Sequence, residues 1–338
     1  MQIKRRYSLW ETIRWTRRDI FIFAAYGLAV SSLYVLLDLT FLSIPWLPIS
    51  LIGIAVAFFL GFKTNSSYDR QWEARKIYGA IVNSSRSWAM QVLGFVTDQF
   101  AEISVSESEV HAVKKELIYR HIAWMTALRY QLRQPKTWEH TNKTDQVNRD
   151  WLGAAEYKTP IEEELKPHLS EADHQYVLSK KNRATHLLNL QSLQLKRLRR
   201  QGLIDDFRHM QMEEMLVDFF TQQGKCERIK NYPFPRQYAT VNYFYIWVFI
   251  ALLPFGLLNV FGPMGGVYPW LTIPFTTLIG WIFYTMERIG DYSENPFEGL
   301  HNDIPITALS RTIEIDLLEM LDEKETPAPI AAEHNFLM

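Results

Sequence analysis

Long stretches without a charged side chain restrict the fold of this chain more than any other feature of its sequence. Asp, Glu, Lys and Arg are absent from residues 20–37, 39–62 and 237–286, although they make up 22% of the chain. A helix needs about 20 mostly apolar residues to cross the roughly 30 Å hydrocarbon layer of a membrane. The last stretch is long enough for two such helices, because the Gly- and Pro-containing segment 262–266 predicts a turn within it. We therefore predict four transmembrane helices, at 20–38, 45–63, 239–261 and 267–287.

The composition of the whole chain excludes several classes of protein. The formal net charge is −1, which does not fit a polybasic nucleic-acid-binding protein. Cys226 is the only cysteine, so the chain cannot form an internal disulfide or a site built from several thiolates. The common catalytic, nucleotide-binding and zinc-binding motifs are absent, and the histidines are scattered. We expect no enzymatic activity, no cofactor, no metal site and no nucleic-acid partner.

Basic side chains near the ends of the predicted spans indicate their orientation, because Lys and Arg gather on the cytoplasmic side of a membrane. They precede the first span, follow the second and precede the third, and the two short connections between spans contain none. We expect a multi-pass protein of the cell inner (plasma) membrane with both termini in the cytoplasm. The predicted parts are an N-terminal helix with the first two spans, a cytoplasmic helical domain, the last two spans and a cytoplasmic C-terminal segment, at 1–63, 64–236, 237–287 and 288–338.

The long polar segment shows helical rather than strand periodicity. No Gly or Pro interrupts residues 62–77, so the second span is predicted to continue as one helix into the polar segment. Gly202 and Gly224 are predicted to end two further helices, and Asp205 or Asp206 to cap the start of the second. Helices are predicted at 66–91, 109–133, 187–200 and 205–223, a loop at 138–148, and a disordered tail after residue 323.

The second predicted span contains two stripes of side chains. Ile54, Phe58 and Phe62 are four residues apart, and each step of four turns only about 40° around a helix, so the three side chains share one face. Small residues that let helices approach closely form the second stripe, at Gly53, Ala57 and Gly61. One interpretation is that the bulky stripe faces lipid or a core. The other is a ring of subunits that pack through the small stripe and point the bulky stripe at a shared axis, where it closes the pore by dewetting.

Several motifs resemble those of the bestrophin family of pentameric ion channels, in its prokaryotic branch. The first two are FFLGFKTN at 58–65 and YDRQWEAR at 68–75. Similar stretches follow in the same order at 229–235, 295–297, 303–305 and 311–314. The resemblance covers nearly the whole chain. It implies an all-α membrane protein with four transmembrane helices and a helical cytoplasmic domain, assembled as a homopentamer around one central pore.

The resemblance also implies roles for particular residues. The family's pore neck is a bulky apolar triplet on the second span, which falls here on Ile54, Phe58 and Phe62. A second, cytoplasmic constriction falls on Phe207, at the start of a helix that follows a Gly-containing turn. Eukaryotic members bind calcium at an acidic run shortly after the Asn-Pro-Phe motif. The corresponding segment here, 298–303, has few carboxylates, whereas calcium needs six to eight oxygen ligands, so we do not expect calcium gating.

The permeating ion is not decided by the sequence. Phenylalanine offers a negative ring face to cations and a positive edge to anions. Eukaryotic members of the family resemble chloride channels, whereas prokaryotic ones favour monovalent cations such as sodium. Asp38, between the first two spans, either forms an acidic ring that attracts cations at the outer mouth or is a solvated interfacial residue. We expect sodium to be slightly favoured over chloride.

The resulting hypothesis is passive conduction of small monovalent ions, with copies of the chain itself, membrane lipids and the ions as partners. The alternative is a membrane-anchored helical sensor or scaffold that does not conduct. A secondary transporter ranks third, because only the polar Asn259 and a break at Pro254 in the third span indicate one.

Overall fold

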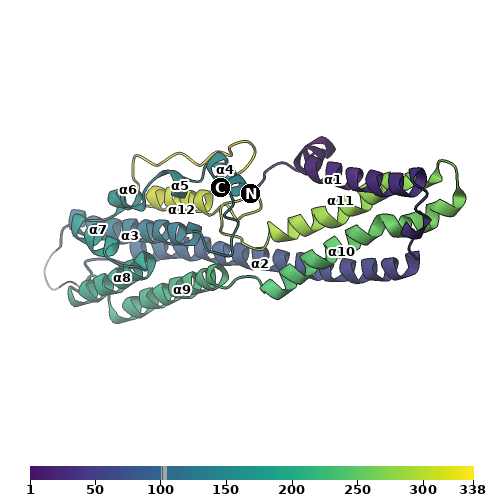
Figure 1. The fold of residues 1–338 in the computed structure, drawn as a ribbon. Coiled ribbons are helices and arrows are strands. Elements are labelled where there is room, and N and C mark those ends of the chain that lie inside the picture. Colours follow the sequence, from purple (N-terminus) through teal and green to yellow (C-terminus); the bar gives the residue numbers. More distant parts are fainter. Residues whose placement is uncertain (100, 102–104) are drawn as a thin grey trace. The chain divides into compact units, whose positions relative to one another are not determined.

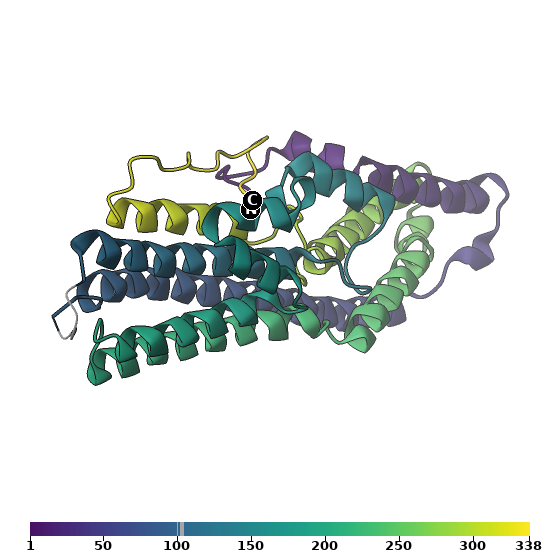
Figure 2. The same cartoon turned by 90° about the vertical axis from the view of Figure 1, so that its left-hand side faces the viewer.

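The computed structural model describes residues 1–99, 101 and 105–338. Its regular elements are helices, and the only strand-like pairings among these residues are isolated bridges at the two chain ends. The chain forms two compact units, each built from separate stretches of sequence. We call residues 4–69 with 234–294 the apolar unit, and residues 1–3, 70–233 and 295–338 the polar unit. Figures 1 and 2 show the helices of each unit running side by side.

The apolar unit contains the predicted spans as long helices. They are α1 (Leu9–Leu36), the first part of α2 (Trp46–Phe95), α10 (Arg236–Phe261) and α11 (Thr272–Asp291). Short 3₁₀ turns connect them at Thr40–Leu42, Gly262–Met264 and Tyr268–Leu271. Among the described residues, three helical segments are long and apolar enough to cross a membrane, at 9–36, 40–95 and 236–264. The fourth predicted span is helical as expected, but α11 does not meet the same measure and carries Glu287, Arg288 and Asp291 near its end.

Close helix contacts hold the apolar unit together. The backbone of α1 approaches α11 at Gly27, where an added Cβ would lie 3.2 Å from the backbone of Ile273. The ring of Phe23 packs against Gly280 in return. Helix α2 approaches α10 at Gly53, where a Cβ would meet the ring of Phe249 at 2.7 Å. Small residues therefore set the helix spacing within a single chain, as expected where apolar burial alone gives no driving force.

The polar unit is a bundle of helices around an aromatic core. Its long helices are the second part of α2, α3 (Glu107–Arg133), α8 (Arg183–Arg200), α9 (Asp206–Asn231) and α12 (Ile306–Met320). Shorter helices lie between them, at Lys143–Leu152 (α4), Ala155–Lys158 (α5), Ile161–Leu165 (α6) and Glu171–Leu178 (α7). Trp88, Trp124 and Phe219 are fully buried and come from α2, α3 and α9. His121 belongs to the same core. The ring centroids of neighbouring members of this group lie at most 6.3 Å apart.

The structure confirms several local predictions. Helix α2 is continuous from Trp46 to Phe95. Asp205 caps α9 by accepting a hydrogen bond from the backbone N–H of Arg208 at 2.9 Å. Gly202 has a positive φ of 72° directly after α8, as a helix-ending glycine should. The contact-defined units change at 69/70, 233/234 and 294/295, whereas the predicted parts change at 63/64, 236/237 and 287/288, and the predicted division into parts stays a prediction.

Three local predictions are wrong. Helix α9 continues through Gly224 to Asn231, because Cys226, Ile229 and Lys230 are buried and offset the roughly 1 kcal/mol that a glycine costs in a helix. The predicted loop at 138–148 contains most of α4, whose start is capped by Asn142.

The tail is the third difference from prediction. Phe336 and Met338 are buried against Leu152 and Ala154 rather than disordered. The backbone N–H of Ala308 donates to the carbonyl of Met338 at 2.7 Å. The tail is ordered because its apolar side chains meet a surface formed elsewhere in the polar unit.

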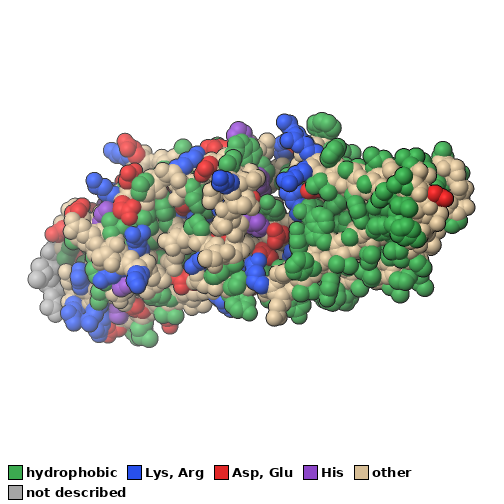
Figure 3. All heavy atoms as spheres, viewed as in Figure 1, with side chains coloured by type: hydrophobic (Ala, Val, Ile, Leu, Met, Phe, Trp, Pro, Cys, Tyr) green, Lys and Arg blue, Asp and Glu red, His purple; other side chains and the backbone are tan. Residues whose placement is uncertain are grey.

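The surfaces of the two units differ in kind. In Figure 3 hydrophobic side chains cover the visible face of the apolar unit almost continuously, whereas basic and acidic side chains alternate over the polar unit. Many of the largest exposed apolar side chains belong to the apolar unit, including Phe21, Phe41 and Leu47, each at least 70% exposed. The apolar unit is therefore suited to a lipid environment.

Candidate functional site

One side of α2 is fixed within the apolar unit. Ile49, Gly53, Val56, Leu60 and Lys63 are buried, at alternating spacings of four and three residues. This spacing places all five on one narrow face of a helix. Three of them share a core with α10, where Phe249 and Leu253 are also buried. The rotation of α2 in this unit is therefore set by its contact with α10.

The opposite side of α2 carries the predicted bulky stripe. Phe58 is two residues from both Val56 and Leu60, which places it about 200° around the helix from the buried face. Ile54, Phe58 and Phe62 are 68%, 63% and 56% exposed in the single chain. The structure thus brings the three predicted pore residues together on one open face.

The stripe is an ordered apolar surface that passes directly into a polar one. The rings of Phe58 and Phe62 meet edge to face, with centroids 4.6 Å apart and an interplanar angle of 87°. On the same face, one turn later, Asn65 donates from Nδ2 to Oδ2 of Asp69 at 3.3 Å. Both of these polar side chains are exposed. A single helix face therefore offers an apolar segment followed by a hydrated one.

The three predicted packing residues do not share one environment. Gly53 is buried against the ring of Phe249 within the same chain. Ala57 and Gly61 are exposed, and a Cβ added at Gly61 would have no neighbour within 4 Å. Two of the three small residues therefore remain open for contact with another helix.

The two remaining predicted residues are both exposed. Asp38 follows α1 with a positive φ of 51°, and its carbonyl accepts a hydrogen bond from the backbone N–H of Thr40 at 2.9 Å. Phe207 lies in the first turn of α9, after the turn at Gly202, and is 86% exposed. The ring of Phe207 therefore buries little of its apolar area within its own chain.

Sequence reasoning missed a buried polar cluster at the end of the stripe. Lys63, which follows Phe62, donates from Nζ to Oε1 of Glu287 on α11. Asn242 on α10 donates from Nδ2 to the other carboxylate oxygen at 2.5 Å. All three side chains are nearly fully buried. The sequence does contain one indication of this cluster: Lys63 and Glu287 are each the first charged residue after a long charge-free stretch.

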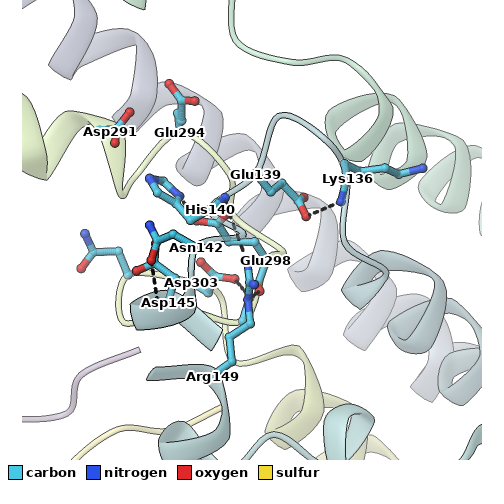
Figure 4. A network of polar contacts seen from close by, with 12 residues as sticks. Lys136, Glu139, His140, Asn142, Asp145, Arg149, Asp291, Glu294, Glu298 and Asp303 are labelled. Atoms are coloured by element: carbon cyan, nitrogen blue, oxygen red, sulfur yellow. Dashed lines mark hydrogen bonds and ion pairs between the residues drawn. The ribbon is translucent and has the colours of Figure 1, made fainter. Parts of the chain in front are cut away.

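A second buried polar cluster lies in the polar unit (Figure 4). Glu298 accepts a hydrogen bond from the backbone N–H of His140 at 3.1 Å and contacts Nδ1 of the same residue at 2.8 Å. Burial raises the pKa of Glu298 to about 7, and the hydrogen bonds from His140 act in the opposite direction. Asp303 pairs with Arg133 at 2.8 Å.

These carboxylates follow the Asn-Pro-Phe motif, yet each already has a partner within the chain. Within residues 1–99, 101 and 105–338, no group of three or more His, Cys, Asp or Glu is placed to hold a metal ion. The expectation that calcium does not gate this protein stays a prediction.

The sequence of this chain matches a known family of proteins. The model of the family described as "Bacterial/Fungal Bestrophin protein" matches residues 11–319. The voltage-dependent anion channel-forming protein YneE of Escherichia coli (strain K12) is 29% identical over 339 aligned residues, which cover 95% of this chain and 96% of that protein. The voltage-dependent anion channel-forming protein RSc3414 of Ralstonia nicotianae is 29% identical over 276 residues, covering 82% of this chain and 77% of that protein.

A solved structure shows the same fold. The bacterial bestrophin homolog from Klebsiella pneumoniae superposes with a TM-score of 0.74 at 23% identity, covering 90% of this chain and 98% of that one. These findings confirm the predicted all-helical membrane fold and the expectation of a channel rather than an enzyme. The chain belongs to the bestrophin family, in its bacterial and fungal branch.

Proposed function

We propose that the protein conducts small monovalent ions passively through a central pore formed by five copies of the chain. Each copy contributes Ile54, Phe58 and Phe62 from α2 to the narrow neck of this pore. The observation that carries the proposal is the position of this stripe, on the open face of α2 opposite the face that α10 fixes. Curated relatives that carry the name of anion channel-forming proteins support a conducting role.

The chemistry of the stripe suits a hydrophobic gate. From Ile54 to Phe62 the helix rises by about 12 Å, at 1.5 Å per residue. A ring of such side chains disfavours water when it narrows and so blocks ions without any charged plug. The exposed Asn65 and Asp69 that follow on the same face would keep the adjoining space hydrated.

Phe207 is proposed as the second constriction, on the cytoplasmic side. Its ring is 86% exposed in the single chain, although it begins a helix whose other large side chains include the buried Met212, Leu216 and Phe219. Exposed Ala57 and Gly61 are proposed to lie where neighbouring α2 helices approach each other. We propose an inner-membrane location with both termini in the cytoplasm, on the distribution of Lys and Arg.

Two arguments give opposite expectations for ion selectivity. The sequence expectation is a slight preference for sodium, with Asp38 as an acidic ring at the outer mouth. The names of the curated relatives favour anions. Reversal potentials measured in planar bilayers under separate sodium and chloride gradients decide between them. Replacing Asp38 with Asn should reduce any sodium preference, and an unchanged reversal potential would remove Asp38 from the permeation pathway.

The pore assignment is tested by recording single channels from purified protein. The variant I54A/F58A/F62A should show larger conductance and longer openings, because a wider and less apolar neck stays hydrated. Phe244→Ala is the matched control, since Phe244 is 59% exposed on α10, away from the stripe. Unchanged currents in the triple variant would exclude the stripe from the pore. Absence of current from the unaltered protein would instead favour the membrane-anchored sensor or scaffold.

A further inference from the structure

The first turns of α1 carry a set of arginines that the pore does not use. Arg14, Arg17 and Arg18 are exposed, and spacings of three and four residues place them on one face of the helix. We propose that this arginine face binds the headgroups of anionic phospholipids. The proposal is independent of ion conduction.

The arginine face has uncompensated positive charge. The two acidic residues of its helix are engaged by other cations: Glu11 pairs with Lys4 at 2.9 Å, and Asp19 pairs with Arg288 at 2.8 Å. Among the residues that the structure describes, Arg14, Arg17 and Arg18 have no ion-pair partner. Three guanidinium groups without carboxylates match the planar, bidentate geometry of phosphate oxygens.

The position of the arginines along α1 fits the headgroup layer. The charge-free stretch begins at residue 20, so the arginines lie within about one turn of it. Trp10 and Trp15 are 71% and 47% exposed near the same turns, and tryptophan is enriched at the level of lipid headgroups. Figure 3 shows basic side chains gathered beside the apolar surface of this unit.

The same face continues as a surface for acyl chains. Phe21 is four residues after Arg17 and is 74% exposed, and Leu28 follows two turns later at 50% exposure. A ligand that has a phosphate next to a hydrocarbon chain would contact both parts of the face. This continuity favours a membrane lipid over a soluble anion, which would contact only the arginines.

Contacts with α11 hold the site in shape before any lipid binds. The guanidinium of Arg288 lies 4.4 Å from the ring centroid of Trp15 and is paired with Asp19. Trp281 donates from Nε1 to Oγ1 of the buried Thr16 at 2.8 Å. The backbone that carries the arginines is therefore fixed on its inner side, while their side chains stay free on the outer side.

The test measures how strongly the full chain selects an anionic lipid. The protein is reconstituted in phosphatidylcholine vesicles that contain a trace of spin-labelled phosphatidylglycerol or spin-labelled phosphatidylcholine. The motionally restricted fraction of each label gives the relative affinity. We expect the protein to prefer phosphatidylglycerol, and R14Q/R17Q/R18Q to weaken the preference at least about tenfold, since each basic group near the surface contributes roughly fivefold.

Two control variants separate a site from general charge. K196Q/R197Q/R200Q removes three exposed basic residues from the end of α8 in the polar unit, where no charge-free stretch follows, and should keep the preference. R14K/R17K/R18K retains the charge but loses the bidentate guanidinium geometry, and should keep only part of the preference. Thermal unfolding of each variant shows whether it is folded.

Three results would overturn the proposal. They are no preference for phosphatidylglycerol in the unaltered protein, an undiminished preference in a folded R14Q/R17Q/R18Q, and an equal loss in the α8 variant. A fourth arm titrates inorganic phosphate into the detergent-solubilised protein. If phosphate displaces phosphatidylglycerol at a concentration similar to that of the lipid, the arginines bind a soluble anion instead.

Discussion

The two units of this chain differ in how much of their apolar side-chain surface they bury within the single chain. The polar unit buries its largest aromatic side chains, such as Trp88 and Trp124, together with charged ones such as Arg133. The apolar unit leaves Phe21 and Phe58 mostly exposed. The polar unit thus completes its own core, whereas the apolar unit has a surface that lipid or another copy of the chain must cover. Side chains on that surface are free to serve function because the fold of one chain does not depend on them.

Breaking a buried ion pair in the polar unit should have the largest effect on stability. Arg133→Met leaves the Asp303 carboxylate buried without its cation, which costs about 3–5 kcal/mol of unfolding free energy. Chemical denaturation of the purified protein, followed by tryptophan fluorescence, measures the change. The matched control is Arg86→Met, because the Arg86–Asp316 pair is 2.7 Å long but half exposed and should contribute less than about 1 kcal/mol. Equal losses in both variants would contradict the assigned role of burial.

The apolar unit should show the same sensitivity at its buried Lys63–Glu287 pair. Lys63→Met leaves Glu287 buried with only Asn242 as a partner, at an expected cost of about 3 kcal/mol. The double variant K63M/E287M should recover most of the loss, since an apolar pair of similar volume often replaces a buried ion pair without penalty. Thermal unfolding in detergent measures both. A double variant less stable than Lys63→Met alone would show that Glu287 has a more important partner.

The buried imidazole of His121 should make the polar unit less stable in mild acid. His121 packs against Trp124 and Phe219, its Nε2 lies 2.9 Å from the Ser85 hydroxyl, and burial lowers its pKa to about 3. In the unfolded chain the imidazole takes up a proton below pH 6.5, so stability is full above that pH and falls as the pH decreases. The loss between pH 7 and pH 5 should be about 2 kcal/mol. His121→Gln should remove this part of the pH dependence, and equal slopes for both proteins would contradict it.

The smallest effect is expected where the bulky stripe is truncated. Phe58→Ala should change the stability of the solubilised single chain by less than about 1 kcal/mol, because its ring is mostly exposed there. Phe249→Ala on α10, where the ring is buried against Gly53, should cost about 3–5 kcal/mol. A large loss of unfolding free energy from Phe58→Ala in the solubilised single chain would mean that the stripe has a structural role.

The parts of the fold that sequence could predict are those set by neighbouring residues. The charge-free stretches, the continuity of α2 and the cap at Asp205 all depend on local composition and spacing. The stripe of Ile54, Phe58 and Phe62 also follows from helical spacing, although spacing alone does not show whether these side chains are exposed or buried.

The parts that sequence could not predict depend on distant contacts. The segment at 143–152 is mostly polar, and α4 is held in place where Arg149 donates to the carbonyl of Glu298, which is far away in the chain. Arg133 looks like an ordinary solvated helix residue until α3 places it against Asp303. Lys63 and Glu287 are likewise unrelated until α2 and α11 pack in the same unit.

The separation of Lys63 from Glu287 has a consequence for biosynthesis. The two residues are 224 positions apart in the chain. At a translation rate of about 5–20 residues per second, Lys63 emerges roughly 10–45 s before its carboxylate partner. An unpaired ammonium is costly in hydrocarbon, so the nascent second span should rest with Lys63 at the water boundary until the final hairpin arrives. The pairing then closes the apolar unit late, after the polar helices between them have been made.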